Sequence, residues 1–238
     1  MVPAVETSSF VIEIKSDQMK QTIAIIGATG NMGSALSKTL AKGPYRLLLM
    51  AQDAGKISAL EEEIRQTNAS ADIEGIRCSR EAGWEADIII MATPYQSEKE
   101  VAGRIQEVAN RKIVISISNP LNENYDGLVT GPASSAAEEL QQLLPSSKVI
   151  KAFNTTFAAD FSQPVIDGKQ VDAFIAGNDK EALVTVSELV RTAGFNPMIA
   201  GDLTMSRTLE QMQFLLIRLG MQHNYNWHAG WKVLHNAA

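Results

Sequence analysis

Three glycines spaced three apart carry the clearest chemical signal, in the stretch "IAIIGATGNMGSAL" at residues 23–36. Gly27 would permit a sharp turn off an apolar strand, Gly30 would let backbone N–H groups approach a diphosphate, and Gly33 would allow close helix–strand packing. A helix starting here would add the partial positive charge of its N-terminus. Glycines also mark ordinary turns. Their position between a strand pattern and a helix pattern nevertheless predicts a dinucleotide-phosphate site.

The end of the next expected strand should select the nucleotide, because it reaches the adenosine ribose. It reads "LLMAQDAGK". Gln52 can hydrogen-bond a hydroxyl, Asp53 could bind the ribose hydroxyls of NAD, and Lys56 could reach the 2′-phosphate of NADP. Asp53 could equally cap the helix that follows. These residues leave the choice between NAD and NADP open.

Other reactive residue types form weaker patterns. Tyr95 and Lys99 have the Tyr-x-x-x-Lys spacing of short-chain dehydrogenases, but Tyr95 directly follows a strand, and we interpret the spacing as coincidence. His223, His228 and His235 lack the i, i+4 relation that chelates zinc on a helix, so we interpret them as surface or packing residues. No Ser/His/Asp triad, carboxylate pair or Cys-x-x-Cys stands out. The sequence predicts neither a catalytic side chain nor a metal site.

Composition excludes several classes of function. The formal net charge of −6 argues against a nucleic-acid partner, which needs a basic face. No apolar run approaches the ~20 residues that span a bilayer, and the N-terminus lacks the pattern of a signal peptide, so we expect no membrane association. The single cysteine, Cys78, excludes an internal disulfide and fits a cytoplasmic protein. We expect it to be a buried small hydrophobe.

After residue 19, apolar segments alternate with helical patterns. We expect strands at 22–26, 45–50, 72–77, 87–92, 112–118 and 148–153, and helices at 32–41, 56–65, 135–144, 179–192 and 204–219. Apolar segments at 171–177 and 196–201 complete the pattern, and 119–134 should be a long loop. Buried strands separated by helices indicate an α/β fold with a doubly wound, mostly parallel sheet of the Rossmann type.

The chain divides into three expected parts. Residues 1–18 form an appendage, 19–155 a dinucleotide-binding domain, and 156–238 an α/β extension that completes the acceptor pocket. Apolar side chains cover much of the helix at 204–219, which fits either core packing or a dimer interface.

Several ordered strings resemble the coenzyme F420-dependent NADP oxidoreductases, a group that includes the cytosolic reductase domains of membrane-bound metalloreductases. The matching strings are "IAIIGATGNMGSAL", "MATPYQ", "ISISNPLN", "SAAEELQQLLPSSKVIKAFNTTFA", "FIAGNDKEA" and "AGFNPMIAGDLTMSRTLEQM". The string "KAFNT" after a helix that ends in "LP" is more specific than the glycine loop. One departure concerns the second strand, which the family usually follows with Ser-Arg to hold the 2′-phosphate. This chain has Ala51–Gln52.

The resemblance implies a nicotinamide dinucleotide lying across the strand tips. It maps the diphosphate onto Thr29, Gly30, Asn31 and Met32, the adenosine onto Ala51, Gln52 and Lys56, and the nicotinamide onto Thr93, Pro94, Tyr95, Ala152, Phe153 and Asn154. Together with Gly27, Ala28 and Gly33 of the glycine motif and with Asp53, these are the predicted cofactor-binding residues. Asn119, Pro120 and Leu121 would shape the pocket of the second redox partner.

The implied function is hydride transfer between NADP, with NAD as the alternative nucleotide, and a deazaflavin (F420) or flavin, in a cytoplasmic homodimer. Such a transfer needs orientation and no acid or base on the protein. A second hypothesis is a dehydrogenase of a small metabolite, with Tyr95, Lys151 or Asn154 as proton donor. A third is a non-catalytic NmrA-like dinucleotide sensor, against which "KAFNT" argues.

Overall fold

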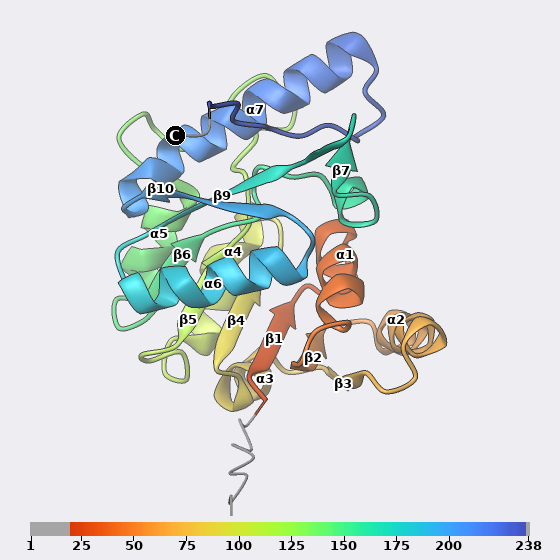
Figure 1. Cartoon of the computed structure of the whole chain (residues 1–238). Helices are drawn as coiled ribbons and strands as arrows, with labels where there is room; N and C mark the ends of the chain where they lie inside the picture. The colour runs from red at the N-terminus through yellow and green to blue at the C-terminus, as the bar shows by residue number, and fades with distance from the viewer. Residues whose placement is uncertain (1–19, 237–238) are drawn as a thin grey trace, which may run out of the picture.

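An eight-stranded, mostly parallel sheet organises the chain (Figure 1). The computed structural model describes residues 20–236, so the predicted appendage at 1–18 lies outside the described residues. The strands, in their order across the sheet, are β10 (Asn196–Gly201), β9 (Asp172–Gly177), β6 (Lys148–Lys151), β5 (Ile113–Ser116), β4 (Ile88–Met91), β1 (Thr22–Ile26), β2 (Arg46–Met50) and β3 (Asp72–Ile76).

The direction of the strands changes once, between β6 and β9. All other neighbours in the sheet are parallel, whereas β9 runs antiparallel to β6. A short hairpin of β7 (Val165–Ile166) and β8 (Lys169–Gln170) precedes β9. The C-terminal part of the chain therefore extends the same sheet, and the division at residues 155 and 156 stays a prediction.

Helices cover both faces of the sheet, as the apolar strands require. One core layer packs α1 (Asn31–Leu40), α2 (Ala54–Thr67) and α6 (Lys180–Thr192) against the strands. The other packs α3 (Ser79–Glu85), α4 (Tyr95–Ile105) and α5 (Ala136–Leu143). Central strand β4 is buried along its whole length, which explains its continuous run of isoleucines. The predicted doubly wound α/β fold is confirmed.

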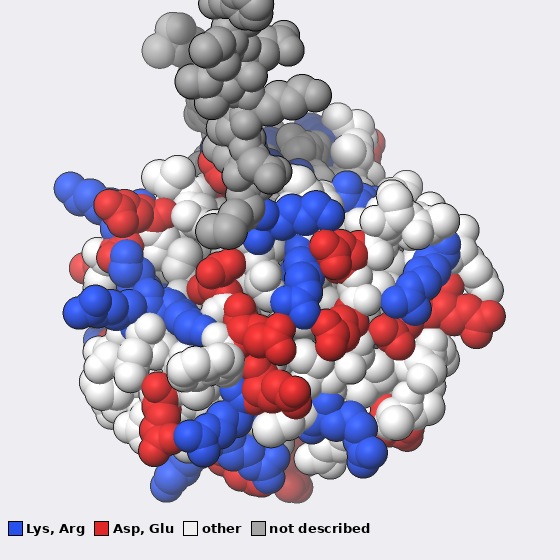
Figure 2. Space-filling model, turned by 90° about the horizontal axis from the view of Figure 1, so that it is seen from below, with Lys and Arg blue, Asp and Glu red and all other residues white. Residues whose placement is uncertain are grey.

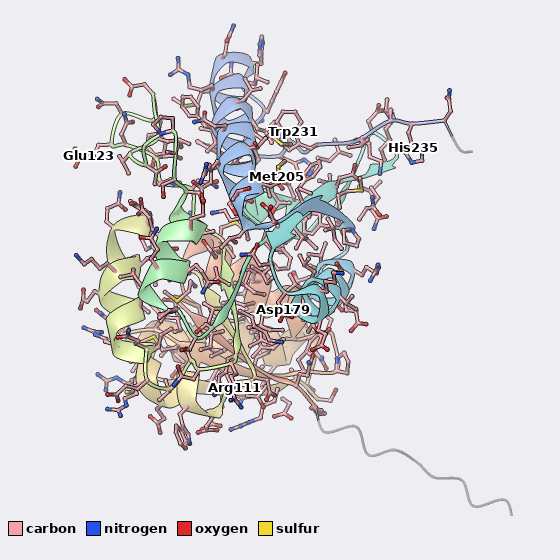
Figure 3. The ribbon with its side chains drawn as sticks, turned by 90° about the vertical axis from the view of Figure 1, so that its left-hand side faces the viewer. Arg111, Glu123, Asp179, Met205, Trp231 and His235 are labelled. Atoms are coloured by element: carbon pink, nitrogen blue, oxygen red, sulfur yellow. The ribbon has the colours of Figure 1, made fainter. Side chains whose placement is uncertain are left out.

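The last helix, α7 (Ser206–His223), lies beyond the carboxyl ends of the parallel strands (Figure 1). The short 3-10 helices η1 (Ala158–Phe161) and η2 (Leu203–Met205) connect this region to the sheet. The expected loop at 119–134 is irregular, and its segment that carries Glu123 stands next to α7 (Figure 3). The face opposite the strand tips mixes basic and acidic side chains (Figure 2). No helix within residues 20–236 is long and apolar enough to cross a membrane.

Three expectations need correction. Helices α3 and α4 follow β3 and β4, and α4 begins at Tyr95, so this residue lies on a helix and not on the strand tip. Strand β6 ends at Lys151, two residues early, because Phe153 adopts a left-handed φ of 59° that a strand cannot continue. Cys78 is exposed, because it follows β3 at the surface, where α3 begins.

Candidate functional site

The fold itself requires two of the three glycines after β1. Gly27 has a φ of 93°, and a Cβ there would lie 2.4 Å from the carbonyl oxygen of Ala92. A Cβ at Gly33 would lie 2.1 Å from the carbonyl oxygen of Gly27, where α1 packs closely on the end of β1. The predicted roles of these residues, a sharp turn and close helix packing, follow from these contacts.

Gly30 differs from both, because the protein leaves room for a side chain there. Its φ of −74° and ψ of 170° suit any residue. A Cβ would approach the Gly27 carbonyl oxygen only to 3.4 Å, an ordinary contact. Neither folding nor packing explains a glycine at this position. A phosphate lying against the loop would explain it, because a Cβ would project into the space that the phosphate needs.

The first turn of α1 is open to an anion. Gly30 stands at the N-cap without a side-chain hydrogen bond, and no acidic residue occupies the first turn. The first N–H groups of a helix have no partner within the helix and carry its positive partial charge. The start of α1 therefore fits a phosphate group, and the assignment of Thr29, Gly30, Asn31 and Met32 to the diphosphate stays a prediction.

A cavity of about 280 Å³ lies beside this loop, between the tips of β1, β2 and β4 and helix α4. The buried hydroxyl of Thr93 has no hydrogen-bond partner among the described residues. The lining residues are Ile26, Gly27, Thr29, Gly30, Met50, Ala51, Gln52, Ala92, Thr93, Pro94, Ser97, Glu100, Val101 and Arg104. The cavity is continuous with the glycine loop and combines apolar walls with a few polar groups, a combination typical of nucleotide sites.

The end of β2 contributes only Ala51 and Gln52 to this cavity. Asp53 caps α2, because its Oδ1 accepts a hydrogen bond from the Lys56 amide at 3.1 Å. Lys56 is absent from the residues that line the cavity, and its side chain starts on the first turn of α2. Of the two roles that the sequence left open for Asp53, the structure displays the helix cap.

Arg104 and Glu100 line the cavity from the side of α4, and the sequence analysis did not single out either residue. Their side chains form an ion pair one helical turn apart. The i, i+4 spacing of Glu100 and Arg104 in the sequence could have indicated this ion pair. It did not, because that spacing brings two side chains together only on a helix, and no helix was predicted here.

A second group of predicted residues meets where β5 and β6 end. Asn119 Nδ2 donates to the Asn154 carbonyl oxygen, and Asn154 Nδ2 donates to Asn119 Oδ1, both at 3.0 Å. Asn154 is buried, and its Oδ1 lacks a hydrogen-bond partner among the described residues. The left-handed turn at Phe153 brings the two asparagines together. The predicted nicotinamide border and the predicted acceptor pocket are therefore directly linked.

Tyr95 is absent from the residues that line the cavity with Thr93 and Pro94. Its hydroxyl donates to Glu139 Oε2 on α5 at 2.6 Å, and the side chain lines a separate cavity of about 400 Å³ with Glu98 and Lys99. Burial and the Glu139 carboxylate raise the pKa of Tyr95. A short-chain dehydrogenase needs the opposite shift, so the interpretation of the Tyr95–Lys99 spacing as coincidence agrees with the geometry.

A buried ion pair lies beneath the strand tips. Lys151 Nζ is 2.7 Å from Glu210 Oε1 on α7 and donates to the Ser118 carbonyl oxygen at 2.5 Å. Both side chains are at most 1% exposed, so Lys151 has no route for giving a proton to an outside substrate. Burial raises the pKa of neighbouring Glu98 to about 7. The pair joins the end of β6 to α7. Helix α7 in turn positions Asn154, because the Leu209 carbonyl oxygen accepts a hydrogen bond from Asn154 Nδ2.

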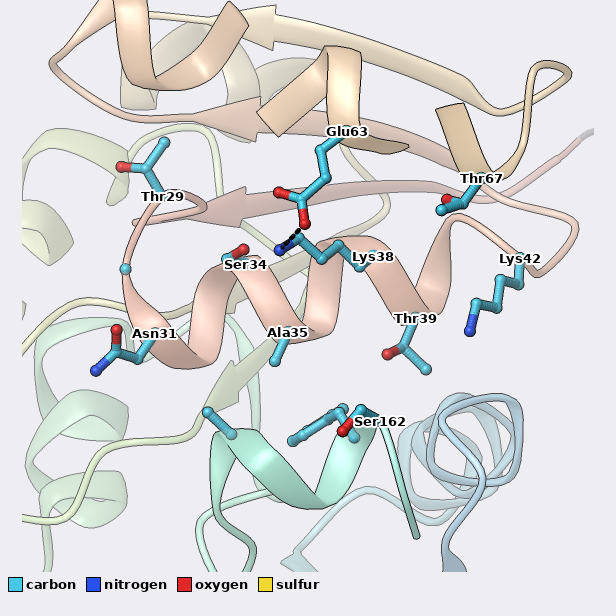
Figure 4. Close-up of a pocket in the computed structure, with 13 residues that line it drawn as sticks. Thr29, Asn31, Ser34, Ala35, Lys38, Thr39, Lys42, Glu63, Thr67 and Ser162 are labelled. Atoms are coloured by element: carbon cyan, nitrogen blue, oxygen red, sulfur yellow. Dashed lines mark ion pairs between the residues drawn. The ribbon is translucent and has the colours of Figure 1, made fainter. Parts of the chain in front are cut away.

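A larger cavity, of about 580 Å³, extends along the outer side of α1 (Figure 4). It shares Thr29, Gly30 and Asn31 with the phosphate loop and reaches Ser162 beyond η1. Lys38 and Glu63, which both line it, form an ion pair with 2.6 Å between Nζ and Oε1 (Figure 4). The glycine loop thus borders hollows on both sides. Within residues 20–236, no three His, Cys, Asp or Glu side chains gather as metal ligands.

Comparison with known proteins places these features in one family. Residues 22–120 match the family described as NADP oxidoreductase, coenzyme F420-dependent. The F420-dependent NADP reductase of Methanocaldococcus jannaschii is 32% identical over 214 residues, which cover 84% of this chain and 93% of the relative. The chain belongs to this family of oxidoreductases, as the sequence motifs predict.

Two further comparisons extend the likeness. Metalloreductase STEAP3 of Rattus norvegicus is 24% identical over 90% of this chain and 40% of its own length. A solved structure from Arthrobacter sp. FB24, provisionally assigned as an F420-dependent NADP-reductase, superposes with a TM-score of 0.76 at 24% identity. It covers 90% of this chain and 99% of its own, and shows that the fold is shared.

Proposed function

We propose that this protein transfers a hydride between NADP and a deazaflavin of the F420 type. Relatives named F420-dependent NADP reductase, which match over most of the chain, support both partners. The observation that carries the proposal is the open phosphate cradle at Gly30, which no packing contact within the protein explains.

The residues of this chain have three tasks in such a reaction. The N–H groups at the start of α1 hold the diphosphate, and the cavity beside β2 and α4 holds the adenosine. Asn119 and Asn154 form a rigid pair at the other end, where the rings of the two partners must stack. When bound, the nicotinamide and the deazaflavin supply the hydride donor and acceptor themselves.

The hydrogen bonds of the polar side chains near the strand tips support direct transfer of a hydride between the two rings. The Tyr95 hydroxyl donates a hydrogen bond to Glu139, and Lys151 Nζ donates to the Ser118 carbonyl oxygen and to Glu210. Asn154 Nδ2 donates to Asn119 and to the Leu209 carbonyl oxygen. Each candidate proton donor of the small-metabolite hypothesis is thus engaged within the protein. A hydride transfer between stacked rings requires only that they be held at near-attack distance.

An isotope experiment tests the proposal. The purified protein is mixed with F420 and with NADPH carrying deuterium at C4 on one face or the other, and the absorbance of the oxidised deazaflavin is followed. We expect reduction of F420 and transfer of deuterium from one face only. FMN and FAD in place of F420 test the flavin acceptor. Nucleotide binding without reduction of any of these acceptors would contradict the proposal and favour a sensor.

The homodimer and the cytoplasmic location stay predictions of the resemblance. We propose the dimer as the working assembly, with α7 as its contact, since Leu215 and Met221 on this helix are each 50% exposed. Light scattering of the purified protein would give its mass in solution. A monomer at micromolar concentration would remove the dimer from the proposal.

A further inference from the structure

We propose that Arg104, on α4, binds the 2′-phosphate of NADP and so makes this chain select NADP over NAD. The inference rests on the proposed function in taking the ligand to be a nicotinamide dinucleotide. It assigns recognition of the adenosine 2′-phosphate to a residue on α4, not to the residues that follow β2.

The charge of the cavity points to Arg104. A phosphate monoester carries about −1.5 to −2 charges at pH 7 and binds best to a guanidinium or ammonium group. Among the described residues that line the cavity at the β2 tip, Arg104 is the only cation. Lys56 is absent from this lining, and Ala51 and Gln52 carry no charge. Arg104 is therefore the one described lining residue that can offer a 2′-phosphate an opposite charge.

The carboxylates near the β2 tip do not favour the alternative nucleotide, NAD. NAD selection needs a carboxylate that accepts hydrogen bonds from both ribose hydroxyls. Asp53 follows β2 at the right distance along the chain, but it serves as the cap of α2. Glu100 is the one carboxylate among the described lining residues, and it pairs with Arg104. In this arrangement the arginine neutralises the acid that could otherwise repel a phosphate.

Two more arginines lie near Arg104. Arg104 also lines a neighbouring cavity of about 570 Å³, together with Arg77 at the end of β3 and Arg80 at the start of α3. Arg80 is paired with Glu107 at 2.7 Å. Arg77 forms none of the ion pairs among the described residues. Positive charge thus continues past Arg104 along the tips of the outer strands.

The ion pair between Arg104 and Glu100 is exposed to solvent. The Arg104 side chain is 48% exposed and that of Glu100 is 68% exposed. A surface ion pair of this kind is worth ~0–1 kcal/mol, so it can open or share its guanidinium with an incoming phosphate. A phosphate, with its larger charge and bidentate oxygens, competes well for the same group.

The test separates the adenosine end from the redox reaction. Binding of 2′,5′-ADP and of 5′-AMP, which differ only in the 2′-phosphate, is measured by calorimetry, together with NADPH and NADH. The variants are Arg104→Gln, Glu100→Gln and Arg77→Gln. Arg191→Gln is the matched control, because it removes the same charge from the end of α6, on the other face of the sheet.

We expect the unmodified protein to bind 2′,5′-ADP more than tenfold more tightly than 5′-AMP. Arg104→Gln should weaken binding of 2′,5′-ADP and NADPH about tenfold or more, as for a lost charge-assisted hydrogen bond, and leave 5′-AMP and NADH within about threefold. Glu100→Gln should strengthen NADPH binding about twofold to threefold, and Arg77→Gln should weaken it by a similar factor. Arg191→Gln should change nothing.

Unchanged NADPH affinity in Arg104→Gln would overturn the inference while the proposed function stands. Weaker NADH binding in Glu100→Gln would also overturn it, because Glu100 would then be a ribose ligand. If the unmodified protein binds neither NADPH nor NADH, the proposed function itself fails. Retained 5′-AMP affinity and an unchanged circular dichroism spectrum show that each variant is folded.

Discussion

Helices α1 and α6 occupy equivalent places in the fold, but their N-termini differ in capping and in charge. Each connects two parallel neighbouring strands, β1 to β2 and β9 to β10. Helix α6 begins after Asp179, whose carboxylate accepts from the Ala182 amide at 2.9 Å and pairs with Lys148 at 2.9 Å. Glu181 adds a second acid in its first turn. Helix α1 begins after Gly30, with neither a cap nor an acid.

The difference shows how one structural unit becomes either a scaffold or a binding site. A helix start leaves N–H groups that need an acceptor. In α6 the chain supplies it, and the two carboxylates would repel a phosphate. In α1 the acceptor must come from water or from a ligand. A glycine at the N-cap costs only a few tenths of a kcal/mol, on the order of 0.3, relative to a capping side chain, and it leaves the first N–H groups free to bind an anion.

Filling the space at Gly30 should have the largest effect. We expect Gly30→Val to weaken nucleotide binding at least about 100-fold, or about 2.7 kcal/mol, because the side chain would occupy the place of the phosphate. The fold should persist, since the backbone at Gly30 suits any residue. Gly220→Val is the control, at a helical glycine with open space. Full affinity in Gly30→Val, measured by calorimetry, would mean that the phosphate does not lie against this loop.

Gly27 should respond in stability instead. We expect Gly27→Ala to lower the free energy of unfolding by about 2 kcal/mol or more, because φ is 93° and the Cβ would lie 2.4 Å from a carbonyl oxygen. Gly168→Ala is the control for the left-handed backbone alone, with a φ of 70° and open space. Urea titration should show a clearly smaller loss there. Equal losses would remove the steric part of the argument.

Giving α1 the acid that α6 has should weaken binding moderately. We expect Asn31→Asp to reduce NADPH affinity about tenfold, which is about 1.4 kcal/mol, through repulsion between the new carboxylate and the diphosphate. Asn31→Gln is the neutral control and should bind within about threefold of the unmodified protein. The loss should shrink in high salt. A loss of the same size in both variants would point to shape and not to charge.

Removing the cap of α6 should have the smallest effect. Asp179→Ala should cost about 1 kcal/mol of unfolding free energy, and Asp179→Asn, which can still cap, should cost less. Nucleotide binding should be unchanged in both. Weaker NADPH binding in either variant would contradict the comparison, in which the capped N-terminus of α6 has no part in nucleotide binding.

The same cap makes stability depend on pH. The Ala182 amide and Lys148 lower the pKa of Asp179 from its usual 3.8. The ionised cap therefore contributes stability above pH 3.8, and the contribution is lost as the pH falls through the lower folded pKa. The advantage of the unmodified protein over Asp179→Asn should shrink on acidification below that value. Urea titration at several pH values measures this.

The regular elements could be predicted to different degrees. The strands β1, β2, β4 and β5 were recognisable because strands buried on both faces are continuous apolar runs. Helix α4 was missed because its buried face uses few apolar residues, among them Val101, Ala102 and Ile105, within an otherwise polar stretch. The exposed Cys78 was predicted wrongly, since a lone cysteine carries no periodic pattern that reports burial.

The sequence by itself determined the glycine loop between β1 and α1, because a strand, a turn and a helix start are local and each glycine acts on its own neighbours. Only the tertiary structure decided what surrounds the rest of the site. It placed Arg104 and Ala51 in the lining of one cavity, joined the Tyr95 hydroxyl to Glu139, and joined Asn119 to Asn154. These contacts depend on how α4, α5 and the strand ends pack, and residue spacing reports only which face of its own element a side chain occupies.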